Sequence, residues 1–253
     1  MTIAVEGRLR RRDVTLLDLP GGGRLLVACD AAGGIGPKAH DTISVPGSVL
    51  GRFTARVALM EVIAAGGRPI LLVNTACVEP APAGSEILDG IREEAALAGL
   101  GPDAITGSFE TNIPTSQTGL GVTALAVAAE PGPTGAHAGD LILAIGRPKV
   151  GPEVSLTDPE IADLPLVRWL AAQPPVHDLL PVGSRGIAAE AADLAATNGL
   201  DLDWLDAEEG WDLAKSAGPA TTVLAAVAPG ALPALALSLD RPWSLIARLT
   251  AKN

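Results

Sequence analysis

The segment Val27–Glu79 constrains the fold more than any other part of the chain. It opens with an apolar run that ends in Asp30 and continues through the glycine-rich loop AAGGIGPKAHD. From Ser48 to Ala65 the apolar residues then fall three or four positions apart, which predicts one buried face of a helix. The continuous apolar run Ile70–Val73 is typical of a strand covered on both faces. The segment therefore predicts a strand, a loop, a helix and a second strand.

The remainder of the chain mixes strand-like and helix-like patterns. Two apolar runs flank Pro20–Gly23, which predicts a hairpin, and Ser85 begins a second helical pattern. The further elements expected are strands in GVTALAVAA and at Leu141–Ile145, Leu200–Leu205, Thr221–Val227 and Ser244–Leu249, and helices at Ser184–Thr197 and Glu208–Ser216. This mixture predicts an α+β (mixed α/β) fold, which we divide into domains at residues 1–136 and 137–253.

The overall charge narrows the classes of partner. The 253 residues carry a formal net charge of −11, with 48% hydrophobic and 19% charged residues. The apolar fraction predicts an ordered protein, and the acidity disfavours a nucleic-acid backbone as the partner. Phosphorylated small ligands stay compatible, because a divalent cation and backbone N–H groups hold phosphate locally.

No segment predicts secretion or a membrane span. The first residues lack the charged and apolar regions of a signal peptide. Ser216–Leu239 carries no charge, but its three prolines break a spanning helix. Cys29 and Cys77 lie in apolar runs and are expected to be buried free thiols in a reducing compartment. We therefore expect a cytoplasmic protein.

The loop after the first strand carries candidate binding residues. Asp30 can hold Mg²⁺ while the N–H groups around Gly34 and Gly36 receive phosphate oxygens, or it can simply satisfy turn amides. Lys38 is one of four lysines in the chain, and it is either a counter-charge for a phosphate or a solvated side chain. Asp41 is a candidate metal or ligand contact.

A second polar loop carries Glu110, Thr111 and Asn112 between Gly107 and Pro114. An acid, a hydroxyl and an amide close together can coordinate Mg²⁺ and triphosphate oxygens, or they can form a capping and turn network. The chain contains neither a G-x-x-x-x-G-K-[ST] motif nor a G-x-G-x-x-G motif, so the two common nucleotide-binding folds lack support.

These segments resemble a known superfamily. The order of four segments resembles that in one superfamily of enzymes: RDVTLLDL, ACDAAGGIGPKAHD, MEVIAAGGRP and ITGSFETN. Its members include aminoimidazole ribonucleotide synthetase, thiamine-monophosphate kinase, selenophosphate synthetase and the hydrogenase-maturation dehydratase. GDLILAIGRPKVGPEV and SAGPATTVLAAV resemble its C-terminal domain. Within the superfamily the chain is most similar to α-ribazole kinase, through GSFETN, Gly34–Lys38 and LPVGSRGIAAEAA. It departs from thiamine-monophosphate kinases, which usually show Asp-Asp-Ala where this chain has Arg12–Val14 and Gly-Gly-Asp-Thr near Gly107–Thr111.

The resemblance implies a homodimer in which each N-terminal domain binds ATP and forms half of an intersubunit β-barrel, followed by a reduced C-terminal domain. It also implies roles for individual residues. Mg²⁺ and ATP would be held by Asp13, Asp30, Asp41 and Glu110, a phosphate would be contacted by Lys38, and Thr111 and Asn112 would lie beside the nucleotide or the acceptor.

The resulting hypothesis is an ATP- and Mg²⁺-dependent kinase that phosphorylates the ribose 5′-hydroxyl of α-ribazole in cobamide salvage, a part of cobalamin biosynthesis. Lys38 and Asp41 are its candidate catalytic residues. The alternatives are thiamine-monophosphate kinase, another ATP-dependent synthetase of the superfamily or, from a different class, a non-catalytic nucleotide-binding regulatory protein. Neither a nucleic acid nor a membrane is expected as a partner.

Overall fold

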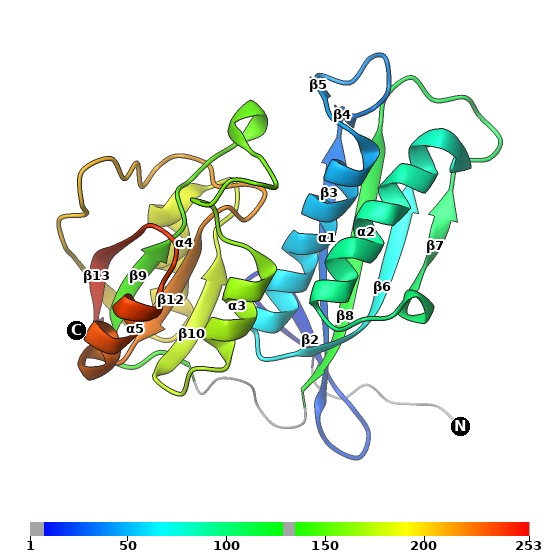
Figure 1. The fold of residues 1–253 in the computed structure, drawn as a ribbon. Helices are drawn as coiled ribbons and strands as arrows, with labels where there is room; N and C mark the ends of the chain where they lie inside the picture. The colour runs from blue at the N-terminus through cyan, green and yellow to red at the C-terminus, as the bar shows by residue number, and fades with distance from the viewer. Residues whose placement is uncertain (1–7, 129–134, 253) are drawn as a thin grey trace. The chain divides into compact units, whose positions relative to one another are not determined.

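The computed structural model describes residues 8–128 and 135–252 (Figure 1). The chain forms two compact units, one made of Met1–Ile63 and Gly67–Glu130 and the other of Ala64–Gly66 and Pro131–Asn253. The first unit thus ends at Glu130, whereas the sequence analysis placed a domain boundary after residue 136. Both units combine a sheet with helices, so the predicted α+β fold class is confirmed.

The first unit contains, within residues 8–128, a six-stranded sheet and a short two-stranded one. The strands of the larger sheet follow the order β1 (Arg8–Arg11), β2 (Val14–Asp18), β3 (Arg24–Gly33), β8 (Gly119–Ala128), β6 (Arg68–Ala76) and β7 (Ile105–Phe109). The pair β6–β7 is parallel and the other pairs are antiparallel. The small parallel pair is β4 (Ile35–Gly36) and β5 (Ile43–Ser44). Over residues 8–128 the larger sheet is open, with β1 and β7 as its edges, so these strands by themselves close no barrel.

The two faces of this sheet differ because side chains alternate along each strand. Leu26 and Ala28 of β3 are buried, whereas Val27 between them is half-buried and Cys29 after them is exposed. Helices α1 (Gly47–Ala64) and α2 (Ser85–Leu97) lie across one face (Figure 1). The expectation that Cys29 and Cys77 are buried is therefore wrong, since both thiols are exposed and Cys29 lies on the opposite face from Leu26.

Helices α1 and α2 approach each other most closely at two glycines. A Cβ atom added at Gly51 would lie 2.1 Å from the carbonyl oxygen of Ile87. One added at Gly90 would lie 2.0 Å from the carbonyl oxygen of Ser48. Only glycine allows the two backbones to touch in this way.

A buried ion-pair network joins the same two helices. Glu94 of α2 is fully buried, and its Oε1 accepts a hydrogen bond from Nε of Arg56, at 2.8 Å. Its Oε2 accepts hydrogen bonds from Nη2 of Arg56, at 3.3 Å, and from Nε of Arg52, at 3.1 Å. An unpaired buried carboxylate would cost free energy, so Glu94 must stay within reach of the two arginines of α1. The network therefore fixes the position of α1 along α2.

The second unit is built on an antiparallel sheet, five-stranded over the described residues. Its order is β10 (Val176–Pro181), β12 (Val223–Val227), β9 (Leu141–Ile145), β13 (Trp243–Ala251) and β11 (Leu200–Trp204). Every residue of β9 and β12 is buried, because these inner strands are covered on both faces. The helices of this unit are α3 (Leu164–Ala171), α4 (Gly186–Thr197) and α5 (Leu232–Ser238). Short helical turns across the chain are η1 (Pro80–Gly84), η2 (Pro102–Ala104), η3 (Gly151–Glu153) and η4 (Pro229–Ala231).

The predicted elements are largely present. The hairpin of β2 and β3 and the helices α1, α2 and α4 are confirmed. The predicted helix at Glu208–Ser216 is wrong, since the chain between β11 and β12 forms turns. There Oδ1 of Asp212 accepts the N–H groups of Ala214 and Lys215, at 3.0 and 3.1 Å, and this local turn competes with a helix. None of the helices that the structure describes is long and apolar enough to cross a membrane.

Replacing Gly90 by alanine is expected to lower the free energy of unfolding by about 3 kcal/mol, because the added methyl group forces the α1 and α2 backbones apart. Urea denaturation measures this change. Gly33→Ala is the matched control, since a Cβ atom there would meet nothing within 4 Å. Equal stability of the Gly90→Ala variant and the wild type would contradict the close helix contact.

Candidate functional site

The loop that follows β3 is held against the segment that leads into β8. The N–H group of Gly34 donates to the carbonyl oxygen of Thr118, at 2.8 Å, and that of His40 donates to the carbonyl oxygen of Ser116, at 3.1 Å. In return, Nε2 of Gln117 donates to the carbonyl oxygen of His40, at 2.7 Å. The two polar loops that the sequence singled out therefore lie side by side, both within the first unit.

Backbone conformation and close packing explain why particular positions of this loop are glycine. Gly34 and Gly36 have φ angles of +69° and +146°, which favour glycine. A Cβ atom on Gly36 would also lie 2.6 Å from Oγ1 of Thr118, so the loop packs directly on that side chain. A Cβ atom on Gly33 would meet nothing within 4 Å, so the last residue of β3 presents open backbone to a potential ligand.

Asp41 locks this loop in place. Its Oδ1 accepts the N–H group of Thr118, at 2.7 Å, and its Oδ2 accepts Oγ1 of the same threonine, at 2.7 Å. Oδ2 also accepts the N–H group of Lys38, at 2.8 Å. Both carboxylate oxygens thus stabilise the loop, and the role of Asp41 as a ligand contact stays a prediction.

Lys38 pairs with an acid that the sequence analysis did not select. Its Nζ forms a close ion pair with Oε2 of Glu79, and the two side chains are 19% and 33% exposed. Glu79 also accepts hydrogen bonds from the N–H and Oγ1 groups of Thr115, each at 3.0 Å. Lys38, followed by the N–H group of Thr115, lowers the pKa of Glu79 to about 2. Glu79 therefore stays ionised at neutral pH and holds the lysine at the end of β6.

Asp30 lies in a different environment from the other acids. It continues the alternation of Leu26 and Ala28 along β3, so its side chain lies on the side of the sheet that the helices cover. Burial raises the pKa of Asp30 to about 6, although the N–H group of Ala31 acts in the opposite direction. No charged group in the described chain contributes to this shift. A carboxylate that is desolvated and lacks a cation is a reasonable ligand for a metal ion.

The second polar loop is organised by Glu110. Its Oε1 accepts the N–H groups of Asn112 and Ile113, at 2.7 and 3.1 Å, and these hydrogen bonds lower the pKa of Glu110. The side chains of Thr111 and Asn112 are exposed. The turn network that the sequence analysis gave as an alternative is therefore present, and the three residues also present polar groups to solvent.

Asp13 lies at the turn between β1 and β2. It is exposed and forms a long ion pair with Arg10, at 3.9 Å. The pairing of Thr15 with Val27 brings this turn beside the second half of β3, which contains Asp30. Over residues 8–128 and 135–252, no three His, Cys, Asp or Glu side chains form a group that could hold a metal ion. The protein alone thus provides single carboxylates at this end of the sheet and no preformed cage.

The residues that the sequence analysis missed are Glu79, Thr115 and Thr118. Glu79 follows the apolar strand β6 much as Asp30 ends the apolar part of β3, so the same pattern of a strand that leads to an acid was available as a signal. The two threonines carried no such signal, because their contacts join residues 36 and 77 positions apart.

The sequence matches no family model, and no curated protein sequence is significantly similar to it. The fold, in contrast, matches solved structures over almost the whole chain. A structure described as AaThiL complexed with AMPPCP and TMP aligns with a TM-score of 0.68 and 14% identity, over 98% of this chain and 87% of that one.

Two further structures show the same likeness. Thiamine-monophosphate kinase from Stenotrophomonas maltophilia K279a aligns with a TM-score of 0.61 and 20% identity, over 98% of this chain and 90% of that one. The hydrogenase maturation protein HypE in complex with ATP aligns with a TM-score of 0.64 and 16% identity, over 93% of this chain and 78% of that one. The chain therefore shares the fold of thiamine-monophosphate kinase and HypE.

The raised pKa of Asp30 predicts a pH-dependent cost to folding. Its pKa is about 6 in the folded protein against 3.8 in the unfolded chain, so stability falls as the pH rises through this window and the loss is complete above it. Asp30→Asn is expected to raise the free energy of unfolding by up to about 3 kcal/mol near pH 7.5, and by less near pH 4.5.

Urea denaturation at both pH values, with a chelator present, measures this difference. Asp89→Asn is the control, because Asp89 lies on the exposed side of α2 with its side chain 64% accessible. A loss of stability in the Asp30→Asn variant near pH 7.5 would show that Asp30 has a stabilising partner instead.

Proposed function

We propose that this protein is an ATP- and Mg²⁺-dependent phosphotransferase that acts on an alcohol group of a small molecule. The observation that carries the proposal is Asp30, a desolvated carboxylate without a protein cation among the described residues, at the end of the strand that leads into the glycine-rich loop. The shared fold with proteins whose structures contain AMPPCP or ATP supports the choice of nucleotide.

The residues at this end of the sheet fit a magnesium ion that arrives with the nucleotide. Mg²⁺ is usually bound by one or two carboxylates, several waters and the phosphate oxygens of the substrate, so no preformed cage is needed. A cation beside Asp30 favours its ionised form and offsets the cost of its burial. We assign Asp13, Asp30, Asp41 and Glu110 as the acids from which the ligands come. When bound, Mg²⁺ offsets the negative charge of the phosphoryl group during its transfer.

The remaining residues position the nucleotide. The backbone at Gly34 and Gly36 and the side chain of Lys38 are the proposed contacts for phosphate, with Glu79 holding the lysine in a defined place before the ligand arrives. Asp41 keeps the loop ordered and is the candidate that accepts the proton of the acceptor hydroxyl. We assign Thr111 and Asn112, which are exposed next to Glu110, to contacts with the nucleotide or the acceptor.

We also propose a homodimer in which a second copy of the chain covers the sheet face opposite α1 and α2. Leu25, Val27, Leu125 and Val127 alternate with the buried residues of β3 and β8 and are only half-buried on this open face. A half-exposed apolar sheet face with free edges is favourably covered by another sheet. The N-terminal domain, assigned to residues 1–136, would then contribute half of a barrel, and residues 137–253 would form the C-terminal domain.

The proposed acceptor is the ribose 5′-hydroxyl of α-ribazole, and it rests on the resemblance of GSFETN, Gly34–Lys38 and LPVGSRGIAAEAA to α-ribazole kinase. Thiamine monophosphate is the second candidate, since a structure of this fold is described as complexed with TMP and another is a thiamine-monophosphate kinase. A regulatory protein that binds the nucleotide without turnover is the alternative from another class.

An acceptor panel tests the proposal. The purified protein is incubated with Mg-ATP and with α-ribazole, thiamine monophosphate or no acceptor, and mass spectrometry detects a gain of phosphate. We expect phosphorylated α-ribazole and unchanged thiamine monophosphate. Formation of thiamine diphosphate would identify thiamine monophosphate as the acceptor instead. ATP binding without product from either acceptor would favour the regulatory alternative, and failure to bind ATP would reject the proposed site.

Two substitutions test the acidic residues. Asp30→Asn and Glu110→Gln are each expected to lower turnover by at least about 100-fold, because each removes a charge that acts on the metal and the phosphates. Steady-state rates at saturating Mg-ATP measure the effect, and Asp89→Asn on α2 is the matched control that should retain the wild-type rate. Near wild-type turnover in both variants, with the fold intact, would reject these site assignments.

A further inference from the structure

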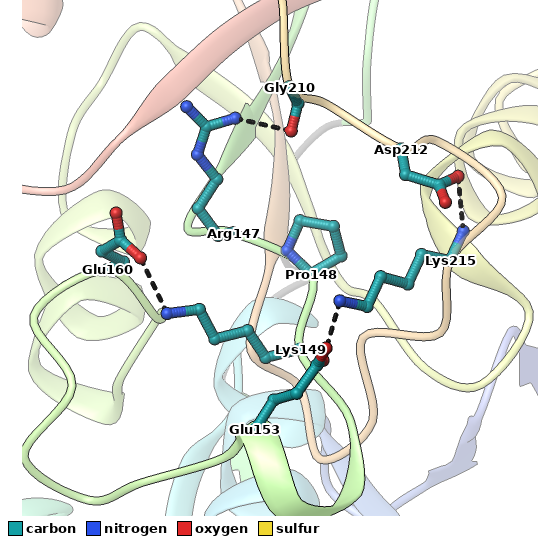
Figure 2. Close-up of a pocket in the computed structure, with 8 residues that line it drawn as sticks. All are labelled: Arg147, Pro148, Lys149, Glu153, Glu160, Gly210, Asp212 and Lys215. Carbon is teal, nitrogen blue, oxygen red and sulfur yellow. Dashed lines mark hydrogen bonds and ion pairs between the residues drawn. The ribbon is translucent and has the colours of Figure 1, made fainter.

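A charged pocket of about 470 Å³ lies entirely within the second unit (Figure 2). It combines three segments that are distant in sequence: the loop after β9, the stretch around η3 and Glu160, and the turns before β12. Its three cations are Arg147, Lys149 and Lys215. Two of the four lysines of this acidic chain therefore line one pocket, whose volume falls in the range typical of small-molecule sites.

Buried hydrogen bonds hold the backbone of the loop after β9. Thr221 and Thr222 are fully buried, and Oγ1 of Thr222 donates to the carbonyl oxygen of Gly146, at 2.8 Å. The N–H group of Lys149 donates to Oγ1 of Thr221, at 2.9 Å, and the N–H group of Arg147 donates to the carbonyl oxygen of Glu160, at 2.8 Å. The backbone that carries Arg147 and Lys149 is thus positioned by the sheet and not by a ligand.

Arg147 is positioned but retains unused hydrogen-bonding capacity. Its guanidinium group stacks on the ring of Trp211, 4.7 Å from the centroid, and its Nη1 donates to the carbonyl oxygen of Gly210, at 3.0 Å. No carboxylate within residues 8–128 and 135–252 forms an ion pair with it. A planar guanidinium fixed by stacking matches the oxygen geometry of phosphate and carboxylate groups.

The two lysines have partners that differ in exposure. Nζ of Lys149 contacts Asp158, at 2.5 Å, and Glu160, at 2.7 Å, and their side chains are 13% and 50% exposed. Nζ of Lys215 contacts Glu153, at 2.7 Å, which is also 50% exposed. Exposed ion pairs are weak and screened by salt. An incoming anion can therefore replace Glu153 and Glu160, while Asp158 remains behind Lys149.

We propose that this pocket binds a phosphate dianion, with Arg147 as the directional contact and Lys149 and Lys215 as the flanking charges. Three donor side chains, two from the loop after β9 and one from the turns before β12, suit a tetrahedral anion, which accepts hydrogen bonds from several directions. A dianion also replaces the two exposed carboxylates charge for charge. The site is built from residues of the second unit alone, and the inference does not depend on phosphoryl transfer.

Tryptophan fluorescence of the full-length protein tests this site, because Trp211 lies against Arg147. The emission is titrated with D-ribose 5-phosphate, inorganic phosphate and D-ribose, and comparison of the first two distinguishes an organic phosphate from free phosphate. We expect a saturable change with at least one phosphate and none with ribose. Trp211→Phe should abolish the change, because the ring of Trp211 is the one on which the guanidinium group of Arg147 stacks.

Matched variants locate the binding site. Arg147→Met and Lys215→Met are each expected to weaken binding by at least about tenfold, through loss of a charge-assisted hydrogen bond. Arg248→Met, which removes an exposed arginine of β13 outside the pocket lining, should leave the affinity unchanged. If Arg147→Met disturbs folding because it removes the contact with Trp211, the Lys215→Met variant still tests the site. The proposal is overturned if neither phosphate binds saturably, or if the folded Lys215 variant binds as tightly as the wild type.

Discussion

The ten-residue antiparallel pairing of β3 with β8 is the constraint on which the first unit depends. It runs from Arg24 opposite Ala128 to Gly33 opposite Gly119 without a break in register. Because side chains alternate along both strands, this register places Leu26, Ala28 and Asp30 on the side that the helices cover. It also sets the end of β3 beside Thr118, and from there hydrogen bonds hold the whole glycine-rich loop. A shift by one residue would reverse the faces and separate these groups.

Three acids of the candidate site are hydrogen-bonded to the loops around them, whereas Asp30 lies in a different environment. Asp41, Glu79 and Glu110 each accept two or three hydrogen bonds from the loops around them. Asp30 is desolvated and has a raised pKa. This contrast is typical of functional sites, in which a group that lowers folding stability is retained because the surrounding structure is stable enough to tolerate it. The loops are therefore ordered before any ligand binds, which lowers the entropic cost of binding.

The second unit shows a different way to build a charged site. Its inner strands β9 and β12 are buried on both faces, and the buried hydroxyl groups of Thr221 and Thr222 hold the loops at their ends. Charged side chains on those loops surround a pocket whose outer ion pairs are exposed. Hydrogen-bonded loops that carry exchangeable ion pairs favour reversible binding of an anion, because few groups become ordered when the partners change.

The sequence by itself determined the local elements and part of the site. The 3.6-residue spacing after Ser48 predicted α1, the apolar runs around Pro20–Gly23 predicted the hairpin, and the position of Asp30 at the end of an apolar run marked the one desolvated acid of the candidate site. These features depend on neighbours along the chain. The tertiary structure alone decided the pairing of Lys38 with Glu79, the contact of Asp41 with Thr118 and the assembly of the pocket around Arg147. Those contacts join residues that lie tens of positions apart, and no local periodicity records them. The turn at Asp212 illustrates the limit, since one side chain that accepts two backbone N–H groups prevented the helix that the local pattern favoured.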